Sequence, residues 1–217
     1  KKIVLEANAN VTVNNPNTGT AKLVLNNSVV DMADNAKTIN RIETNNLTLK
    51  GEVDLALDAD LANKAIDSIE ASNSTIDPNS TIKITDVNIL SDLDVGEKEV
   101  ALSPLDGLQK ISSSYFDISG IGIGSTGNGK VLSGKYVYKL SVLDDEVTDE
   151  KLLFTKIGIN NAEALTGLPK AIYDKSSLYT MTGDEKIDAW LADSSTGETD
   201  GGKLLADITV KGNGFDI

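Results

Sequence analysis

The glycine-rich segment at residues 124–130, GSTGNGK, has the spacing of a phosphate-binding loop, G-x-x-x-x-G-K. Gly122, Gly124 and Gly127 add a G-x-G-x-x-G pattern. A phosphate loop needs backbone N–H groups directed at the phosphate, a helix N-terminus behind them and a hydroxyl on Mg²⁺. Val131 stands where the hydroxyl residue is required, and the following GKYVYKLSVL alternates like a strand. The segment is therefore predicted to be a turn between two strands, with no nucleotide-binding residues.

Closely spaced carboxylates are a second candidate, because Ca²⁺ takes several oxygen ligands at once. Two D-x-D pairs could contribute to such a site, Asp58 with Asp60 and Asp92 with Asp94. A further acidic run covers residues 144–150. None has the EF-hand spacing with its glycine and closing glutamate, so solvated acidic turns are the favoured interpretation. No metal ligand is assigned, and Ca²⁺ is the only cofactor that the pattern leaves open.

Paired carboxylates also serve glycoside hydrolysis, in which basic groups and aromatic rings commonly hold the sugar. Arg41 is the only arginine, and in the strand-like TINRIET it is better explained as a solvated side chain or a salt-bridge partner. Tyr136 and Tyr138 lie on one face of a strand and are expected to pack, and Trp190 is expected to dock a helix. The absence of His and Cys removes the commonest general base and the thiol nucleophile. We therefore expect a non-catalytic protein.

The charge of the chain limits its partners. Thirty-three acidic residues face twenty basic ones, a net charge of −13 at pH 7. This balance disfavours nucleic acid, whose phosphates need clustered Lys and Arg. The longest apolar runs are a few residues, so this segment is not expected to insert into a membrane. The lack of Cys fits bacterial surface proteins, and both ends read as if cut from a longer chain.

Period-two alternation of apolar and polar residues dominates the chain and predicts strands separated by turns rich in Asn, Asp, Gly, Ser and Thr. No alternation with long helices occurs, which leaves a sandwich, a barrel or a solenoid. Residues 1–50 hold eleven of the nineteen asparagines. In a solenoid these either stack in amide ladders or simply form turns, and the sequence leaves both open. The alternating stretches are 22–26, 46–51, 52–58, 81–90, 98–103, 134–143 and 206–212.

Residues 161–200 break this alternation. Thr182 and Glu185 match a capping box, and a short amphipathic helix is expected at about 183–193. Its apolar face would consist of Ile187, Trp190 and Leu191.

The chain is accordingly divided into three parts. Residues 1–160 are expected to form a β-solenoid body, 161–200 a lateral excursion with the short helix, and 201–217 a resumed solenoid coil.

One long stretch, residues 46–108, resembles the late passenger region of bacterial autotransporter adhesins. The terminal ITVKGNGFDI is similar to the opening coil of such passengers. The resemblance implies a right-handed, pectin-lyase-type β-helix. The pattern is carried by Leu47, Leu49, Val53, Leu55, Leu57, Asp60, Leu61, Asn63, Asp67, Ile69, Thr81, Ile82 and Ile84.

We therefore expect an all-β fold, a right-handed parallel β-helix with a short helical side excursion; a β-sandwich is the alternative. Coils of this kind stack to bury one continuous core. The inward residues should be Leu49, Leu55, Leu57, Ile82, Ile84 and Ile89, with Lys50 on the opposite face.

The expected function is that of an extracellular or cell-surface structural and adhesive rod. It would contact host or neighbouring-cell surface glycans or proteins through repeated turn residues. A self-assembling extracellular fibre or matrix protein is one alternative, and a polysaccharide lyase or hydrolase is another.

Overall fold

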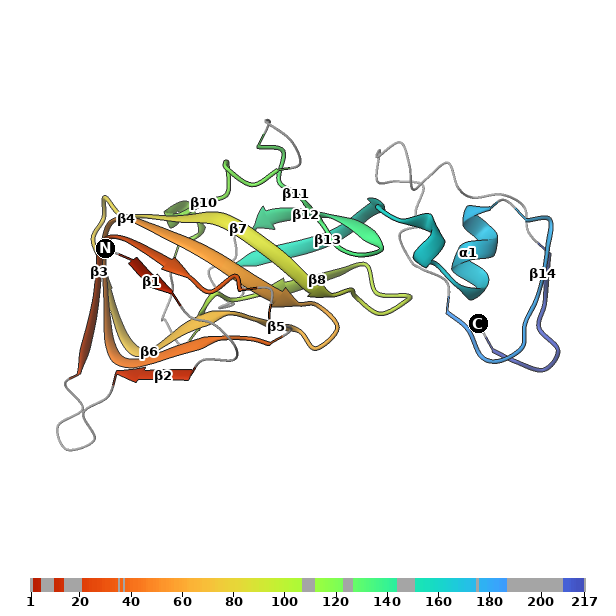
Figure 1. Ribbon diagram of the computed structural model, residues 1–217, viewed down its shortest axis with the longest axis horizontal. Coiled ribbons are helices and arrows are strands. Elements are labelled where there is room, and N and C mark those ends of the chain that lie inside the picture. Colours follow the sequence, from red (N-terminus) through yellow and green to blue (C-terminus); the bar gives the residue numbers. More distant parts are fainter. Residues whose placement is uncertain are drawn as a thin grey trace.

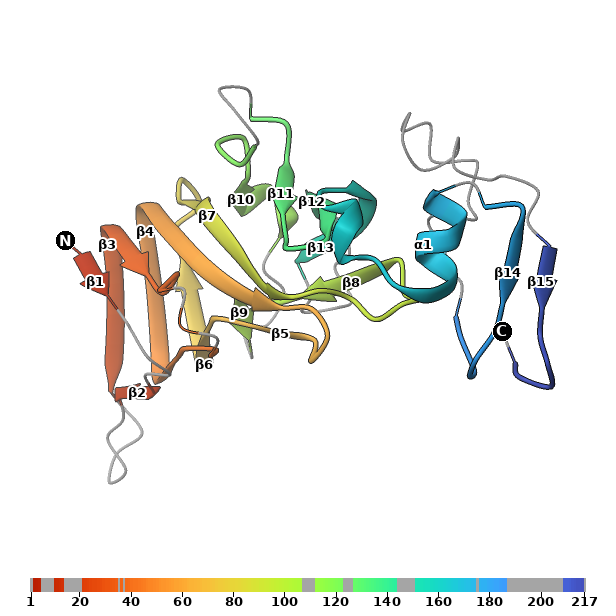
Figure 2. The ribbon, with the colours of Figure 1, turned by 45° about the vertical axis from the view of Figure 1, so that its right-hand side comes forward.

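The protein is an elongated, mostly β molecule in the computed structural model (Figure 1). The structure describes residues 2–4, 10–13, 21–34, 36, 38–106, 112–122, 127–143, 151–174, 176–186 and 209–216. Stacked parallel strands form its N-terminal part, an antiparallel sheet lies in the middle, and a helix with two short strands lies at the far end (Figures 1 and 2).

Parallel strand pairs define a β-solenoid. The first half of β4 pairs in parallel with β2 and β6, and its second half pairs with β7. β3 lies beside both halves, and β1 lies beside the end of β3. The expected parallel β-helix is therefore confirmed, and the β-sandwich alternative is wrong because sandwiches pair their strands antiparallel. The strands are β1 (Lys2–Val4), β2 (Asn10–Val13), β3 (Lys22–Asp31), β4 (Arg41–Asp60), β6 (Ser68–Ile76), β7 (Thr81–Ser91), β9 (Leu105–Asp106) and β10 (Phe116–Asp117).

Alternating side chains of these strands fill the space inside the coils. Leu49, Leu55, Leu57, Ile82 and Ile84 are all buried in one cluster, as predicted, and Ile89 packs against it from a partly buried position. Lys50 is exposed, also as predicted. Successive coils repeat the same inward positions, so each coil covers the apolar edge of the one before it.

The second sheet differs from the expected continuation of the solenoid to residue 160. Within the described part of the chain, parallel pairing of the coils ends at Asp117, and the three pairings of the second sheet, in the order β11-β12-β13-β8, are antiparallel. Alternation predicts a strand but not the direction of its partner. Residues 133–135 leave room for only a tight hairpin, and a tight hairpin makes β11 and β12 antiparallel. The strands are β8 (Glu99–Leu102), β11 (Lys130–Leu132), β12 (Tyr136–Val142) and β13 (Leu152–Ile159).

Two tyrosines dock this sheet onto the end of the solenoid. Tyr136 and Tyr138 are 2% and 0% exposed and belong to the same apolar cluster as the coils, so their expected packing role is confirmed. The Tyr138 hydroxyl lies 3.2 Å from the Asp92 carboxylate and accepts the Leu93 N–H at 3.1 Å. The buried Lys156 ammonium lies 4.2 Å from the Tyr136 ring centre, a cation–π distance.

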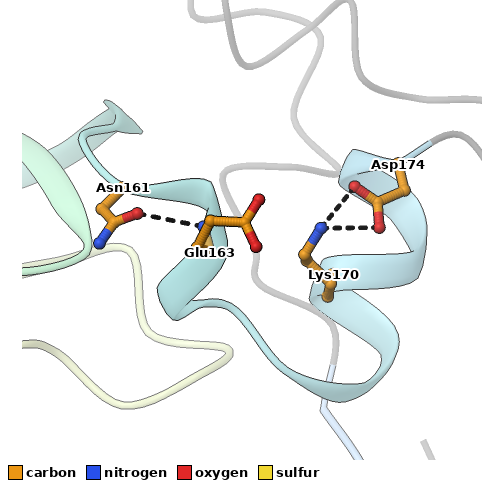
Figure 3. Close-up of polar contacts among 4 residues, drawn as sticks. All are labelled: Asn161, Glu163, Lys170 and Asp174. Carbon is orange, nitrogen blue, oxygen red and sulfur yellow. Dashed lines mark hydrogen bonds and ion pairs between the residues drawn. The ribbon is translucent and has the colours of Figure 1, made fainter.

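The C-terminal part contains the α-helix of the described residues, α1 (Gly167–Tyr173), after the short 3₁₀ helix η2 (Ala162–Ala164). Figure 3 shows Asn161 accepting the Glu163 N–H at 3.1 Å and Lys170 bonded to Asp174 one turn later at 2.7 Å. β14 (Leu178–Thr180) and β15 (Thr209–Lys211) pair in parallel in a sheet of their own. The resumed strand near residue 210 is thus present, beside β14 rather than on the solenoid sheet.

The helix expected at about 183–193 does not begin where the capping box predicts. Residues 183–186 are not helical, and residues 187–193, with Trp190, lie outside the described residues. Glu185 instead accepts the Leu168 N–H at 2.6 Å and caps α1. Thr166, the residue before α1, makes no side-chain hydrogen bond to the helix. The N–H of Leu168 is instead capped by Glu185, which lies seventeen residues after Leu168 in the chain. The remaining short elements are β5 (Ala65–Ile66) and the 3₁₀ helix η1 (Ser113–Tyr115).

Candidate functional site

Three acidic side chains stand in one row on the outer face of the coils. Glu43 on β4 pairs in register with Glu70 on β6, and Glu70 pairs with Asp106 on β9. Thr12 on β2 continues the row on the other side of Glu43. Neighbouring strands lie about 4.8 Å apart, so the solenoid presents one carboxylate per coil at that spacing. We call Glu43, Glu70 and Asp106 the acidic row.

The single arginine lies beside this row. Arg41 Nη1 is 3.0 Å from Glu70 Oε1 and 4.0 Å from Glu43 Oε1, and its side chain is about half exposed. Its expected role as a salt-bridge partner is confirmed. Burial raises the pKa of Glu70, the Arg41 charge opposes the rise, and the charges of Asp106 and Glu43 add to it. The row therefore carries more negative charge than its one arginine balances.

The acidic row lines a shallow groove. Its volume is about 450 Å³, and Thr44, Asn45 and Ser72 lie along it with the three acids. A second hollow of about 480 Å³ shares Glu70 and Asp106 and extends over Arg41 and Lys64. Carboxylates, hydroxyls, amides and two basic groups thus lie along one face, which offers many hydrogen-bonding groups and more polar than apolar surface.

Sequence reasoning missed the acidic row, because outward residues of different strands meet only once the register is known. A signal was nevertheless present. Arg41-Ile42-Glu43 and Ser68-Ile69-Glu70 repeat the same polar–Ile–Glu pattern, and the structure places the two triplets side by side. Comparing the chain with itself at the spacing of one coil would have paired them.

The four candidate calcium ligands are used in separate contacts. Asp58 is fully buried and accepts the Asn88 amide at 2.9 Å. Asp60 accepts the Asn63 amide at 2.7 Å and also binds the Ser91 hydroxyl. Asp92 accepts the hydroxyls of Ser133 and Tyr138, and Asp94 is exposed at a turn. Within the described ranges, no three acidic side chains are grouped so as to hold a metal ion.

Asp58 belongs instead to a buried carboxyl cluster, made of Asp34, Asp58 and Asp67. Asp67 Oδ1 accepts the Asn40 N–H at 2.5 Å, and its Oδ2 accepts the Asp58 N–H at 2.7 Å. Asp58 Oδ2 accepts the Asp34 N–H at 3.2 Å. Asp58 and Asp67 are both 0% exposed, so these groups hold coils together and do not face a ligand.

The described part of the glycine-rich segment is a turn that leads into a strand. Asn128 Oδ1 accepts the Lys130 N–H at 3.0 Å, and β11 begins at Lys130, where a phosphate loop would require a helix. Residues 123–126 lie outside the described residues, as does the acidic run at 144–150. The absence of nucleotide binding stays a prediction.

Asparagines also connect the coils. Asn46 donates to the Ala21 carbonyl at 3.0 Å, Asn40 donates to the Met32 carbonyl at 3.0 Å, and Asn27 accepts the Glu52 N–H at 3.1 Å. Asn46 and Asn73 are register partners on β4 and β6. These contacts run from an amide to the backbone, so the asparagines satisfy main-chain groups at coil boundaries.

The molecule thus contains a parallel β-solenoid with an acidic groove on one face, followed by an antiparallel sheet that packs on the end of the solenoid. No protein-family model, no curated protein and no solved structure matches the chain. None of the helices described is long and apolar enough to span a membrane.

Proposed function

We propose that this chain is a non-catalytic adhesive rod of the cell surface or extracellular space, which binds a glycan or protein along the groove of the acidic row. The observation that carries the proposal is the register of Glu43, Glu70 and Asp106 on three successive coils. A solenoid repeats its surface at a fixed rise, so a partner with its own short repeat can touch several coils at once.

The chemistry of the groove favours a hydroxyl-rich or cationic partner. Carboxylates of the acidic row can accept hydrogen bonds from sugar hydroxyls, and neighbouring Asn45 and Ser72 can both accept and donate them. The net charge of −13 disfavours polyanions. Each such contact is weak in water, and binding would come from several of them acting together.

The protonation of the carboxylates supports a non-catalytic role. Asp67 has its pKa raised to about 7, the range of a general acid, but it is 0% exposed and both oxygens accept backbone N–H groups. A general acid must reach the atom that it protonates. Burial raises the pKa of Glu70, in the groove, and the Arg41 guanidinium, 3.0 Å away, opposes that rise.

The proposed location rests on a sequence resemblance. Residues 46–108 resemble the passenger regions of bacterial autotransporter adhesins, and the parallel β-solenoid is the fold that this resemblance implies. Secretion by that route is part of the proposal.

Measuring both binding and turnover distinguishes this function from the lyase or hydrolase alternative. The purified chain is applied to immobilised neutral, amino-bearing and acidic glycans, and retained protein and released sugar are both measured. Retention on neutral or amino-bearing glycans, without new reducing ends or unsaturated products, is the expected result. Product release would replace the proposal with an enzyme, and the absence of retention on every glycan would remove the glycan as partner.

A further inference from the structure

We propose that Asp34, Asp58 and Asp67 form a pH-dependent clamp between successive coils, which stabilises the fold most at acidic pH and loses this contribution as the pH rises to neutrality. The inference does not depend on the proposed binding function. None of its three carboxyl groups lines the groove of the acidic row.

Asp67 closes one coil on itself. It lies at the corner between β5 and β6, and its two oxygens accept N–H groups from the two ends of the coil that contains β4. Asn40, directly before β4, donates at 2.5 Å, and Asp58, near the end of β4, donates at 2.7 Å. All three residues are 0% exposed. One carboxyl group therefore fixes the start of a coil, its end and the start of the next coil.

Asp58 extends the connection in both directions along the solenoid. Its Oδ2 accepts the N–H of Asp34, which follows β3, at 3.2 Å. Its Oδ1 accepts the Asn88 amide of β7 at 2.9 Å. Asp34 Oδ1 accepts the Ala36 N–H at 2.7 Å. The chain of contacts thus joins segments from three consecutive coils.

Among the described residues, the charged groups that act on Asp67 are all acidic. The charged groups that act on it are Asp58 of β4 and Asp34 after β3, and Asn40 and Asn88 are neutral. Burial raises the pKa of Asp67 to about 7, the two neighbouring carboxylates add to the rise, and the N–H groups of Asn40 and Asp58 oppose it. Burial also raises the pKa of Asp58, and Asp34 contributes to the rise. Protonation removes buried like charge, and a protonated carboxyl group keeps acceptor capacity for a backbone N–H.

The direction of the pH effect follows from these shifts. An unfolded aspartate loses its proton near pH 4, and Asp67 in the folded chain keeps its proton to about pH 7. Between these values the folded state holds more protons than the unfolded state, so stability falls as the pH rises. The folding equilibrium constant loses up to about tenfold per pH unit for this one proton.

Two measurements on the full chain test the clamp. The first is the titration of the Asp67 Cγ resonance in the folded protein. A midpoint between pH 6 and 8 is expected, and a midpoint below 5 would overturn the proposal. The second is urea unfolding from pH 4.5 to 8.0 at high salt, which screens the general repulsion of an acidic protein. The folding constant should fall with rising pH up to about pH 7.

Variants assign this dependence to the cluster. Asp67→Asn should abolish most of the fall between pH 5 and 7, and Asp34→Asn should lower the Asp67 midpoint while keeping the Ala36 contact. If Asp67→Asn does not fold, the pH dependence of Asp34→Asn and the titration of the Asp67 Cγ resonance still test the clamp. The control is Asp86→Asn, which removes one exposed charge on β7 and should leave the dependence unchanged. An unchanged dependence in both cluster variants contradicts the clamp. The clamp is also contradicted if added Ca²⁺ stabilises the unmodified protein but not Asp34→Asn, because the three carboxyl groups would then form a metal site.

Discussion

Asn27 lies over Gly51 of the next coil, and both residues have positive φ, 44° and 62°. The Asn27 amide oxygen accepts the Glu52 N–H at 3.1 Å, so it bridges the two coils at the turn where the register between β3 and β4 shifts. A Cβ on Gly51 would lie 2.9 Å from Asn27 Cγ and would overlap its oxygen. The turn therefore needs glycine at residue 51 for both conformation and space.

Gly51→Ala should lower the free energy of unfolding by about 1–3 kcal/mol, because it combines left-handed strain with displacement of the Asn27 amide. Urea unfolding measures the change. Gly134→Ala is the matched control, since a Cβ there meets nothing within 4 Å and the backbone is outside the left-handed region. Equal losses for the two variants would show that the Asn27–Gly51 contact does not set the turn.

Leu55→Asp should destabilise the solenoid by about 4 kcal/mol or more, because it places an unpaired charge in the apolar cluster, where Leu55 is 0% exposed. Lys50→Asp, on the exposed face of the same strand, should change stability by about 0.5 kcal/mol or less. Both are measured by urea unfolding at one pH. If the two substitutions were equally mild, the inward and outward positions of β4 would be reversed.

Glu185→Ala should loosen the start of α1 by about 1 kcal/mol, because it removes the acceptor of the Leu168 N–H and the partner of the Tyr179 hydroxyl. Hydrogen exchange of the α1 amides is the appropriate measurement, since a local change can leave global unfolding unaffected. Glu163→Ala is the control, an exposed glutamate six residues before Pro169 in the same region. Protection of α1 that survived Glu185→Ala would contradict the cap.

Much of the solenoid could be predicted because long parts of its strands alternate between apolar and polar residues. Leu49, Leu55 and Ile82 were assigned to the core on this basis, and the alternating stretch at 81–90 corresponds to β7. β13 was missed because LLFTKIGI is apolar at consecutive positions, a pattern that does not show which face is buried.

The remaining differences come from contacts between segments distant in the chain. Gly167 and Pro169 suggest a turn, yet Pro is tolerated in the first turn of a helix, where its missing N–H costs no bond. Glu185 matched a local capping box but caps a helix seventeen residues earlier. The acidic row likewise depends on the register between β4, β6 and β9, and the sequence of one strand does not show how it is aligned with its neighbours.

The central claim is that binding is spread along the acidic row, and affinity for the best-retained glycan tests it most directly. Glu43→Gln, Glu70→Gln and Asp106→Asn are measured singly and together, with Asp86→Asn on another face as control. Each single change should weaken binding by less than about tenfold, and the triple change should weaken it by roughly the product of the three single factors. No sugar should be released by any of these proteins. Binding or turnover abolished by one of the three substitutions would contradict the account, because an enzyme loses orders of magnitude with one catalytic carboxylate.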